Sequence, residues 1–304
     1  MEQLKQQLQA AGILYKENEP LSAHCTFRIG GPADLFGMPR DEDQLCQTVQ
    51  FCKQAEIRYY LLGNGSNILF ADEGFRGAVI DVSAEAAGMG LSIYQNADSD
   101  YISAPAGLKL SELCKFALQH GYTGLEFAYG IPGTVGGAVY MNAGAYGGEM
   151  KDVLEAVSYL TADGRWVDSE ASELEFSYRH SAFEENDACI LGAVFHLEKG
   201  DPDAIKARMN ELMQKRIDKQ PLDKPSAGST FKRPAGAFAA ALIDQCGLRG
   251  YRHGGAAVSD KHCGFVVNLG GATCADVLAL CDEVRAIVKE KTGYDLEKEI
   301  RVVK

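Results

Sequence analysis

The sequence is poor in the features that mark exported, membrane-spanning or metal-binding proteins. Nowhere does it contain the roughly 18 uninterrupted apolar residues that a membrane helix requires. Its first segment, MEQLKQQLQA, has neither the basic start nor the apolar stretch of a signal peptide. No CxxC or HExxH spacing occurs, and the six histidines are isolated. We therefore expect a cytoplasmic protein that enters no membrane and holds no metal through its own side chains.

Positive charge and paired cysteines are also scarce. Lysine and arginine total 30 against 42 aspartates and glutamates, which gives a formal net charge of −12. This balance argues against non-specific nucleic-acid binding, because that requires a basic face. The nine cysteines are odd in number and scattered through apolar segments, as reduced thiols would be. We expect a monomer that acts on small molecules and meets anionic ligands with local basic patches.

What is present is the composition of an ordinary globular protein. The 304 residues, 46% of them hydrophobic, suffice for about two domains. Helical spacing of apolar residues predicts amphipathic helices over residues 1–11, 41–55, 111–120, 202–219 and 275–291. The hydroxyl of Ser111 can cap the third helix, and Gly121 is expected to end it. Asp201 and Pro202 supply an N-cap and a proline at the first helical position, so a domain boundary is placed near residue 200.

Short β-prone runs complete the pattern. They predict strands over residues 59–62, 68–70, 78–82, 153–160 and 189–197, and a last strand near the C-terminus. Helices and strands are mixed without regular βαβ alternation, which favours an α+β fold over a doubly wound α/β fold. In the last strand the two-residue period places one set of residues on one face and a second set on the other. The first set is Glu297, Glu299 and Arg301, and the second is Leu296, Ile300 and Val302.

Two glycine-rich segments stand out. In residues 62–69, Gly63 and Gly65 would let backbone N–H groups approach a phosphate without interference from a Cβ atom. The segment is no Rossmann fingerprint, because the third glycine is missing and a short strand follows, and a hairpin turn explains it equally well. Residues 130–148 are too glycine-rich for a regular helix or strand. So many costly glycines in an apolar stretch indicate that the backbone contacts a large planar or phosphorylated ligand.

Four motifs in one order make the likeness to a known family specific. They are LLGNGSN, GIPGTVGGAVYMNAGAYGGE, FSYRHSAF and KQPLDKPSAGSTFKRP. From about Thr26 to the end, the sequence resembles the UDP-N-acetylenolpyruvoylglucosamine reductase family of bacterial peptidoglycan synthesis. The resemblance implies FAD as cofactor, NADPH as reductant and UDP-N-acetylglucosamine enolpyruvate as substrate. It also implies an FAD-binding domain of the vanillyl-alcohol-oxidase type over residues 1–200, with subdomains of about 1–82 and 83–200, and an α+β substrate-binding domain over 201–304.

The resemblance further implies roles for individual residues. Arg179 of the Y-R-x-S motif would lie beside the substrate carboxylate, Ser229 would donate a proton, and Glu299 would stabilise the developing charge. From the residues alone, Arg179 is better explained as a solvated surface arginine, Ser229 as a loop serine, and Glu299 could equally belong to a solvent-facing strand. The implied substrate-binding residues are Tyr178, Arg216, Lys219 and Arg301, of which Arg216 and Lys219 could instead complement a helix dipole. The implied cofactor-binding residues are Gly63, Asn64, Gly65, Ser66, Asn67, Ile68, Leu69, Gly130, Ile131, Pro132, Gly133, Thr134, Gly136, Gly137, Ala138, Asn142 and Gly144. The tyrosine-bearing loop of one form of the family has no counterpart here.

Three other interpretations stay open at this point. Ser229 with Lys232, the triplet at 259–261 and the triplet at 291–293 follow the order of a penicillin-recognising serine enzyme, but in the wrong context. An oxidase or dehydrogenase of alcohols, sugars or hydroxy acids on the same FAD-binding architecture would share the glycine-rich segments. A non-catalytic nucleotide-sugar-binding protein would be colourless when purified.

Overall fold

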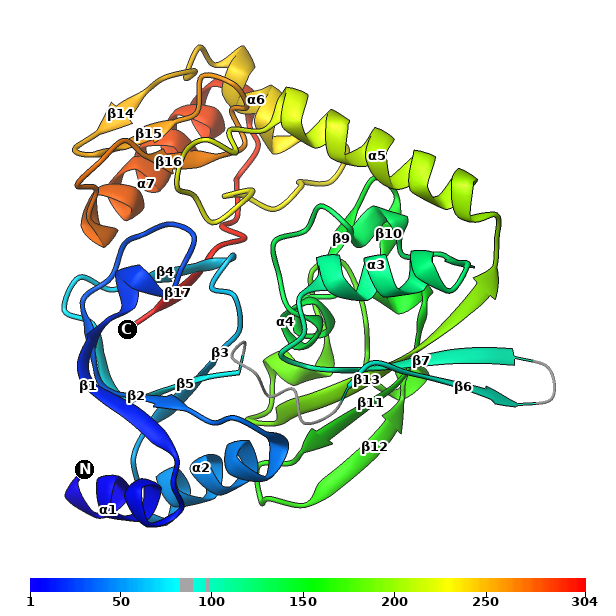
Figure 1. Cartoon of the computed structure of the whole chain (residues 1–304). Helices are drawn as coiled ribbons and strands as arrows, with labels where there is room; N and C mark the ends of the chain where they lie inside the picture. The colour runs from blue at the N-terminus through cyan, green and yellow to red at the C-terminus, as the bar shows by residue number, and fades with distance from the viewer. Residues whose placement is uncertain (83–89, 97–98) are drawn as a thin grey trace. The chain divides into compact units, whose positions relative to one another are not determined.

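The computed structural model describes residues 1–82, 90–96 and 99–304 (Figure 1). The chain forms two compact units that interleave along the sequence. The first consists of Met1–Lys16, Leu35–Asn64 and Gly77–Lys215, and the second of Glu17–Asp34, Gly65–Arg76 and Arg216–Lys304. The division into residues 1–200 and 201–304 stays a prediction, and its inner boundary at 82 and 83 borders residues outside the described part. The α+β class is confirmed by the element order.

An antiparallel sheet of six strands forms the centre of the first unit. Its order is β12 (Trp166–Glu170), β11 (Leu154–Leu160), β13 (Cys189–Lys199), β7 (Ser99–Pro105) and β6 (Ser92–Asn96), with β8 (Tyr122–Thr123) pairing the end of β13. Helices α3 (Leu110–Gln119) and α4 (Val135–Tyr140) share one apolar core with β7 and β13, built around residues such as Leu113, Val139 and Phe195. The helices thereby fix the segments next to them against a rigid sheet.

A second core of the first unit lies under its two N-terminal helices. Leu4 and Leu8 of α1 (Glu2–Ala10) pack with Leu45 and Val49 of α2 (Glu42–Gln54). Helix α2 begins where the sequence predicts, because the Asp41 carboxylate accepts the N–H of Gln44 at 2.8 Å. Strands β1 (Leu14–Pro20), β2 (Pro32–Met38), β5 (Phe75–Asp81) and β3 (Tyr59–Leu62) form a sheet in that order, and β3 runs parallel to β5.

The start of α3 corrects the predicted cap. The helix begins at Leu110, with Lys109 at the N-cap position and no side-chain cap, so Ser111 already lies inside it. The N–H of Leu110 donates instead to the carbonyl of Gly133 at 3.0 Å. A backbone partner more than 20 residues away in sequence thus does what a local hydroxyl was expected to do. The helix ends as predicted, with Gly121 at a left-handed φ of +71°.

Helix α4 was not predicted, because the glycine content of residues 130–148 indicated neither a helix nor a strand. The helix exists because Thr134 caps it, with its hydroxyl accepting the N–H of Gly137 at 3.3 Å. Gly136 allows the close approach of a neighbouring chain, since a Cβ atom there would lie 2.8 Å from that of Ala106. Part of the glycine content therefore serves packing inside the protein.

The second unit holds a three-stranded antiparallel sheet, of β14 (Arg252–His253), β15 (Ala256–Val258) and β16 (Val266–Asn268), with helices α6 (Ala239–Gln245) and α7 (Cys274–Thr292). Helix α7 carries a capping box of Thr273 and Asp276 and ends at Gly293, as the sequence predicts. The Asp72 carboxylate adds two bonds to the first turn, from the N–H groups of Cys274 at 2.7 Å and Ala275 at 3.0 Å. Helix α5 (Pro202–Lys219) begins at the predicted proline.

The last strand is shorter than predicted. Only β17 (Arg301–Val303) is regular strand, and it pairs in parallel with β4 (Ile68–Phe70). The chain bends at Ile300, so the alternation shifts and Val303 is buried in place of Val302. The regular alternation predicted over residues 296–302 is therefore interrupted between Glu299 and Arg301.

Among the described residues, no helix is long and apolar enough to cross a membrane. In the same part of the chain, no group of three or more His, Cys, Asp or Glu side chains could hold a metal ion.

All nine cysteines carry free thiols, and all except Cys46 are buried. Burial raises the pKa of the Cys52 thiol to about 12 and that of Cys281 to about 12, which makes both poor nucleophiles.

Candidate functional site

The two glycine-rich segments meet within the first unit. The side-chain amide of Asn64 donates to the carbonyl of Pro132 at 2.6 Å. Beside this bond, a Cβ atom on Gly63 would lie 2.6 Å from the hydroxyl of Thr134, so only glycine fits. Thr134 is buried and its hydroxyl also caps α4. The turn after β3 is therefore seated directly against the residues that begin α4.

The same place offers backbone donors to a ligand. The N–H groups of Gly63 and Asn64 donate no hydrogen bond to any residue that the structure describes. The first turn of α4 differs, because the N–H groups of Val135 and Gly136 donate to carbonyls of the 106–108 segment at 2.8 Å each. Anionic oxygens would therefore be met by the turn at Gly63, and the helix N-terminus is already occupied. These residues fit a dinucleotide pyrophosphate.

The continuation of the first glycine-rich segment belongs to the second unit. Gly65 has a left-handed φ of +58°, and a Cβ atom there would collide with the carbonyl of His24. Ile68 and Leu69 are buried in β4. The Asn67 side chain donates to the carbonyl of Glu299 at 3.2 Å, and the Asn67 carbonyl accepts the N–H of Arg301 at 2.9 Å. This segment thus holds the backbone of the residues at 299–301.

Arg179 occupies a tight turn in the first unit. The backbone groups of Ser177 and His180 pair at 3.1 Å and 3.2 Å, which leaves Tyr178 and Arg179 at the tip. Arg179 has a φ of +56°, a conformation that costs a non-glycine residue about 1–3 kcal/mol and is kept only where neighbours enforce it. Its guanidinium donates to the carbonyl of Gly144 at 3.1 Å and lies 5.4 Å from the ring centre of Tyr178. Backbone strain at a predicted catalytic residue is typical of functional sites.

Ser229 and Glu299 lie on paired chain segments in the second unit. The carbonyl of Thr230, the residue after Ser229, accepts the N–H of Glu299 at 2.8 Å. Thr230 is almost fully buried, and its hydroxyl accepts the N–H of Val266 at 2.8 Å. Ser229 is exposed and Glu299 is half-buried. The backbone segments that carry these two predicted residues therefore pair with one another, whereas Arg179 is described with the first unit.

The basic residues at the end of α5 have a neighbour that the sequence did not indicate. The Lys261 ammonium donates to the carbonyl of Ile217 in the last turn of α5 at 2.6 Å. This bond already complements the helix C-terminus, which is the structural role left open for Arg216 and Lys219.

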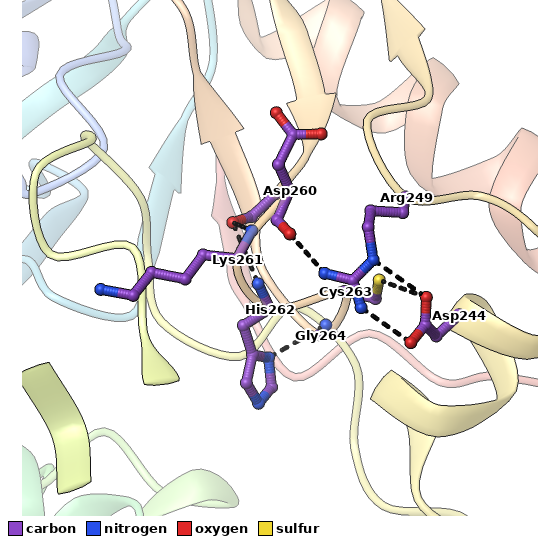
Figure 2. Close-up of polar contacts among 8 residues, drawn as sticks. Asp244, Arg249, Asp260, Lys261, His262, Cys263 and Gly264 are labelled. Carbon is purple, nitrogen blue, oxygen red and sulfur yellow. Dashed lines mark hydrogen bonds and ion pairs between the residues drawn. The ribbon is translucent and has the colours of Figure 1, made fainter. Parts of the chain in front are cut away.

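A polar cluster fixes the loop that carries Lys261 (Figure 2). Arg249 donates to both carboxylate oxygens of Asp244, at 3.1 Å and 2.7 Å, and also to the carbonyl of Asp260. The Cys263 thiol donates to Asp244 at 3.5 Å. The hydrogen bonds from Arg249 hold the pKa of Asp244 below its usual value. Asp244 and Arg249 together stabilise the turn at residues 259–264 in a fixed shape.

His262 lies within this turn and is the group that sequence reasoning missed. Burial lowers its pKa, and the charges of Arg249 and Lys219 lower it further, so the ring is neutral at pH 7. The N–H of Gly264 donates to Nδ1 at 3.1 Å, which leaves the proton on Nε2 as a donor (Figure 2). In the sequence His262 stands alone in the fragment SDKHCG, with no second histidine or cysteine at a metal-binding spacing.

The penicillin-recognising interpretation is wrong on structural grounds. Lys291 to Gly293 ends helix α7 and forms no strand. The Lys291 ammonium donates to the carbonyl of Cys246 at 3.1 Å, and Lys232 pairs with Glu297 at 2.6 Å. Neither lysine is placed as such an enzyme would require.

The antiparallel α+β module with two adjoining glycine-rich turns defines a flavoprotein. In agreement, residues 33–170 match the family described as "FAD binding domain". Residues 220–303 match the family described as "UDP-N-acetylenolpyruvoylglucosamine reductase, C-terminal domain".

Similar proteins identify the family. The UDP-N-acetylenolpyruvoylglucosamine reductase of Lachnoclostridium phytofermentans is 48% identical over 286 residues, covering 94% of this chain and 92% of that protein. The protein of the same name from Caldanaerobacter subterraneus is 46% identical over 294 residues, covering 96% and 94%. The crystal structure of UDP-N-acetylenolpyruvylglucosamine reductase from Thermus caldophilus matches with a TM-score of 0.77 and 33% identity, covering 96% of this chain and 99% of that one. The chain belongs to the UDP-N-acetylenolpyruvoylglucosamine reductase family.

Proposed function

We propose that this chain catalyses the NADPH-dependent reduction of UDP-N-acetylglucosamine enolpyruvate to UDP-N-acetylmuramate, with Arg179, Ser229 and Glu299 as catalytic residues. The reaction is inferred from the similarity to this family over nearly the whole chain. Residues of both glycine-rich segments, at Gly63, Asn64 and Pro132, would hold FAD. Bound FAD supplies the redox chemistry, since it takes hydride from NADPH and delivers it to C3 of the enolpyruvyl group. We further propose that the enzyme acts in the cytoplasm as a monomer.

Arg179 would bind the carboxylate of the enolpyruvyl group. Hydride addition at C3 places negative charge on C2 and the carboxylate, and a planar guanidinium can donate two hydrogen bonds to carboxylate oxygens. The tight turn supports this role, because the paired backbone of Ser177 and His180 and the bond to the Gly144 carbonyl hold Arg179 in place. Fixed donors of this kind lower the barrier without reorganising during the reaction.

Ser229 would supply the proton that C2 needs, and Glu299 would stabilise the enol-like carboxylate. A serine hydroxyl is a poor acid, so it needs neighbouring charge or a water relay to deliver its proton. The pairing of Thr230 with Glu299 supports a shared site, because it fixes the two side chains on adjacent backbone segments. The balance is then complete: one hydride adds to C3, one proton adds to C2, and NADPH becomes NADP.

Basic side chains of the second unit would bind the substrate diphosphate. Arg216 and Lys219 lie in the last turn of α5, and Lys219 is close enough to His262 to lower the pKa of its ring. Tyr178, with 43% of its surface exposed, and Arg301 are the remaining proposed substrate contacts. Local positive charge of this kind offsets the acidic character of the chain as a whole.

The proposal is tested by turnover with defined substrates. NADPH consumption should require UDP-N-acetylglucosamine enolpyruvate, and the product should be two mass units heavier than the substrate. An Arg179→Lys variant keeps the charge but loses the two-pronged geometry, and it should turn over about a hundredfold more slowly while still binding FAD. NADPH consumption at an equal rate without the enolpyruvyl substrate would instead indicate an oxidase.

A further inference from the structure

Asn142 has an unusual position just after helix α4. It is completely buried, yet its backbone has a left-handed φ of +40°. Asparagine is among the few residues that tolerate this conformation. The residue was expected to contact the cofactor, but its side chain is directed to groups of the protein.

The side chain of Asn142 makes three hydrogen bonds. Its Nδ2 donates to the carbonyl of Ser177 at 2.8 Å and to a carboxylate oxygen of Glu149 at 2.9 Å. Its Oδ1 accepts the N–H of Lys151 at 3.0 Å. An amide supplies two donors and an acceptor at one place, which neither aspartate nor leucine can do. Any contact between Asn142 and a cofactor would therefore come from its backbone.

Ser177, whose carbonyl accepts this bond from Asn142, is the first residue of the turn that carries Arg179. The other end of that turn is held by Ser181, a fully buried residue whose hydroxyl donates to the carbonyl of Tyr140 at 2.7 Å. The Arg179 side chain itself donates to the carbonyl of Gly144. All three contacts come from residues 140–144. The second glycine-rich segment thus holds the catalytic turn at its start, its tip and its end.

We propose that Asn142 and Ser181 are positioning residues that fix the strained turn and so aim the guanidinium of Arg179 at the substrate carboxylate. The inference rests on the proposed function for the role of Arg179, while the contacts that carry it stand independently. Because Asn142 and the Tyr140 carbonyl that Ser181 contacts both belong to the segment whose Pro132 bonds to Asn64, the turn is tied to the proposed cofactor cradle. Neither residue touches the reacting atoms in this account.

The test separates the two half-reactions of the FAD-loaded enzyme. In Asn142→Asp the two donors are lost and a second carboxylate faces Glu149, and in Asn142→Gly the amide is lost while the positive φ is still allowed. Flavin reduction by NADPH should change less than twofold in either variant. Reoxidation by the enolpyruvyl substrate should slow by about 10- to 100-fold, because small misplacements of a positioned group have effects of that size.

A double-mutant comparison distinguishes positioning from general structural damage. In an Arg179→Ala background, Asn142→Gly should cost less than about twofold in reoxidation rate, because its effect passes through the missing guanidinium. Ser181→Ala should behave like Asn142→Gly, and Ser181→Thr, which keeps the hydroxyl, should restore most of the rate. Asn186→Gly is the matched control, since this exposed asparagine also donates to a backbone carbonyl, that of Ala182 at 3.0 Å. Additive effects in the double variant would overturn the proposal.

A second readout does not depend on the reaction. Amide hydrogen exchange of a peptide spanning residues 174–183, measured on the FAD-loaded enzyme without substrate, should rise at least tenfold in Asn142→Gly and stay unchanged in Asn186→Gly. Unchanged exchange in both variants would contradict the proposed anchoring. If the wild-type enzyme fails to be reoxidised by the enolpyruvyl substrate, the proposed function falls, and the exchange result still decides whether Asn142 holds the turn.

Discussion

The side-chain amide of Asn64 donates a 2.6 Å hydrogen bond to the carbonyl of Pro132, 68 residues further along the chain. This one bond joins the two glycine-rich segments that the sequence offered as separate motifs. Next to it, the N–H groups of Gly63 and Asn64 donate to no described residue, beside the buried Thr134. This arrangement supports the proposal that FAD binds in the first unit.

Removal of that bond should weaken FAD binding. Asn64→Ala frees the Pro132 segment, and we expect FAD to bind about two- to tenfold more weakly, the range for one lost hydrogen bond. Titration of the FAD-free protein, followed by the quenching of flavin fluorescence, measures the dissociation constant. Asn186→Ala removes a comparable side-chain bond and should leave it unchanged. An unaltered affinity in Asn64→Ala would mean that the two segments do not act together.

Gly63 should be intolerant of any side chain. A Cβ atom there would lie 2.6 Å from the Thr134 hydroxyl, so Gly63→Ala should destabilise the protein by about 1–3 kcal/mol. Gly90→Ala is the control, since a Cβ atom there meets no atom of the described residues within 4 Å. Urea denaturation of both variants gives the difference in free energy of unfolding. Equal stabilities would show that the Thr134 region shifts at little cost.

The Asp72 carboxylate should contribute to the stability of the second unit. It accepts two N–H groups at the start of α7, and its replacement by alanine should cost about 1–2 kcal/mol, as for other lost N-caps. Glu290→Ala, on the exposed side of the same helix, is the comparison. Chemical denaturation measures both. A loss below about 0.3 kcal/mol would indicate that the Thr273 and Asp276 capping box suffices alone.

The free energy of unfolding should decrease as the pH is lowered, over a range set by the titration of His262. The folded protein lowers the pKa of this ring below its usual 6.5, so the unfolded chain binds its proton more readily. The contribution is therefore complete above the unfolded pKa of about 6.5 and is lost as the pH falls below it through the lower folded pKa. His262→Asn, which keeps an acceptor for Gly264, should flatten the pH dependence of the unfolding midpoint over that range. An identical slope in wild type and variant would contradict the assignment.

Local signals account for the parts of the fold that the sequence predicted well. Helices α2, α5 and α7 carry their own caps, in Asp41, Pro202 and Gly293, so their bounds could be expected to within a residue or two. Helix α4 could not, because its glycines disfavour a helix and the close approach of Gly136 to Ala106 exists only in the folded chain. The start of α3 was misplaced for a similar reason, since its partner at Gly133 is distant in sequence.

The candidate site was predictable by resemblance and only partly by physics. The pattern around Arg179 suggested an ordinary surface arginine, and its left-handed backbone appears only in the folded chain. The contacts of Asn142 and His262 involve partners such as Ser177 and Arg249, which no spacing rule connects to them. Such tertiary contacts form only in the folded chain, so a single sequence does not indicate them.

The central claim is most directly tested by following the flavin absorbance of the purified enzyme without oxygen. NADPH should bleach the oxidised flavin band in wild type and in Ser229→Ala alike. Added UDP-N-acetylglucosamine enolpyruvate should then restore the band in wild type, and it should do so about a hundred- to a thousandfold more slowly in Ser229→Ala. If the band stays bleached in wild type, or if Ser229→Ala recovers at the wild-type rate, the proposed reaction or the role of Ser229 is contradicted.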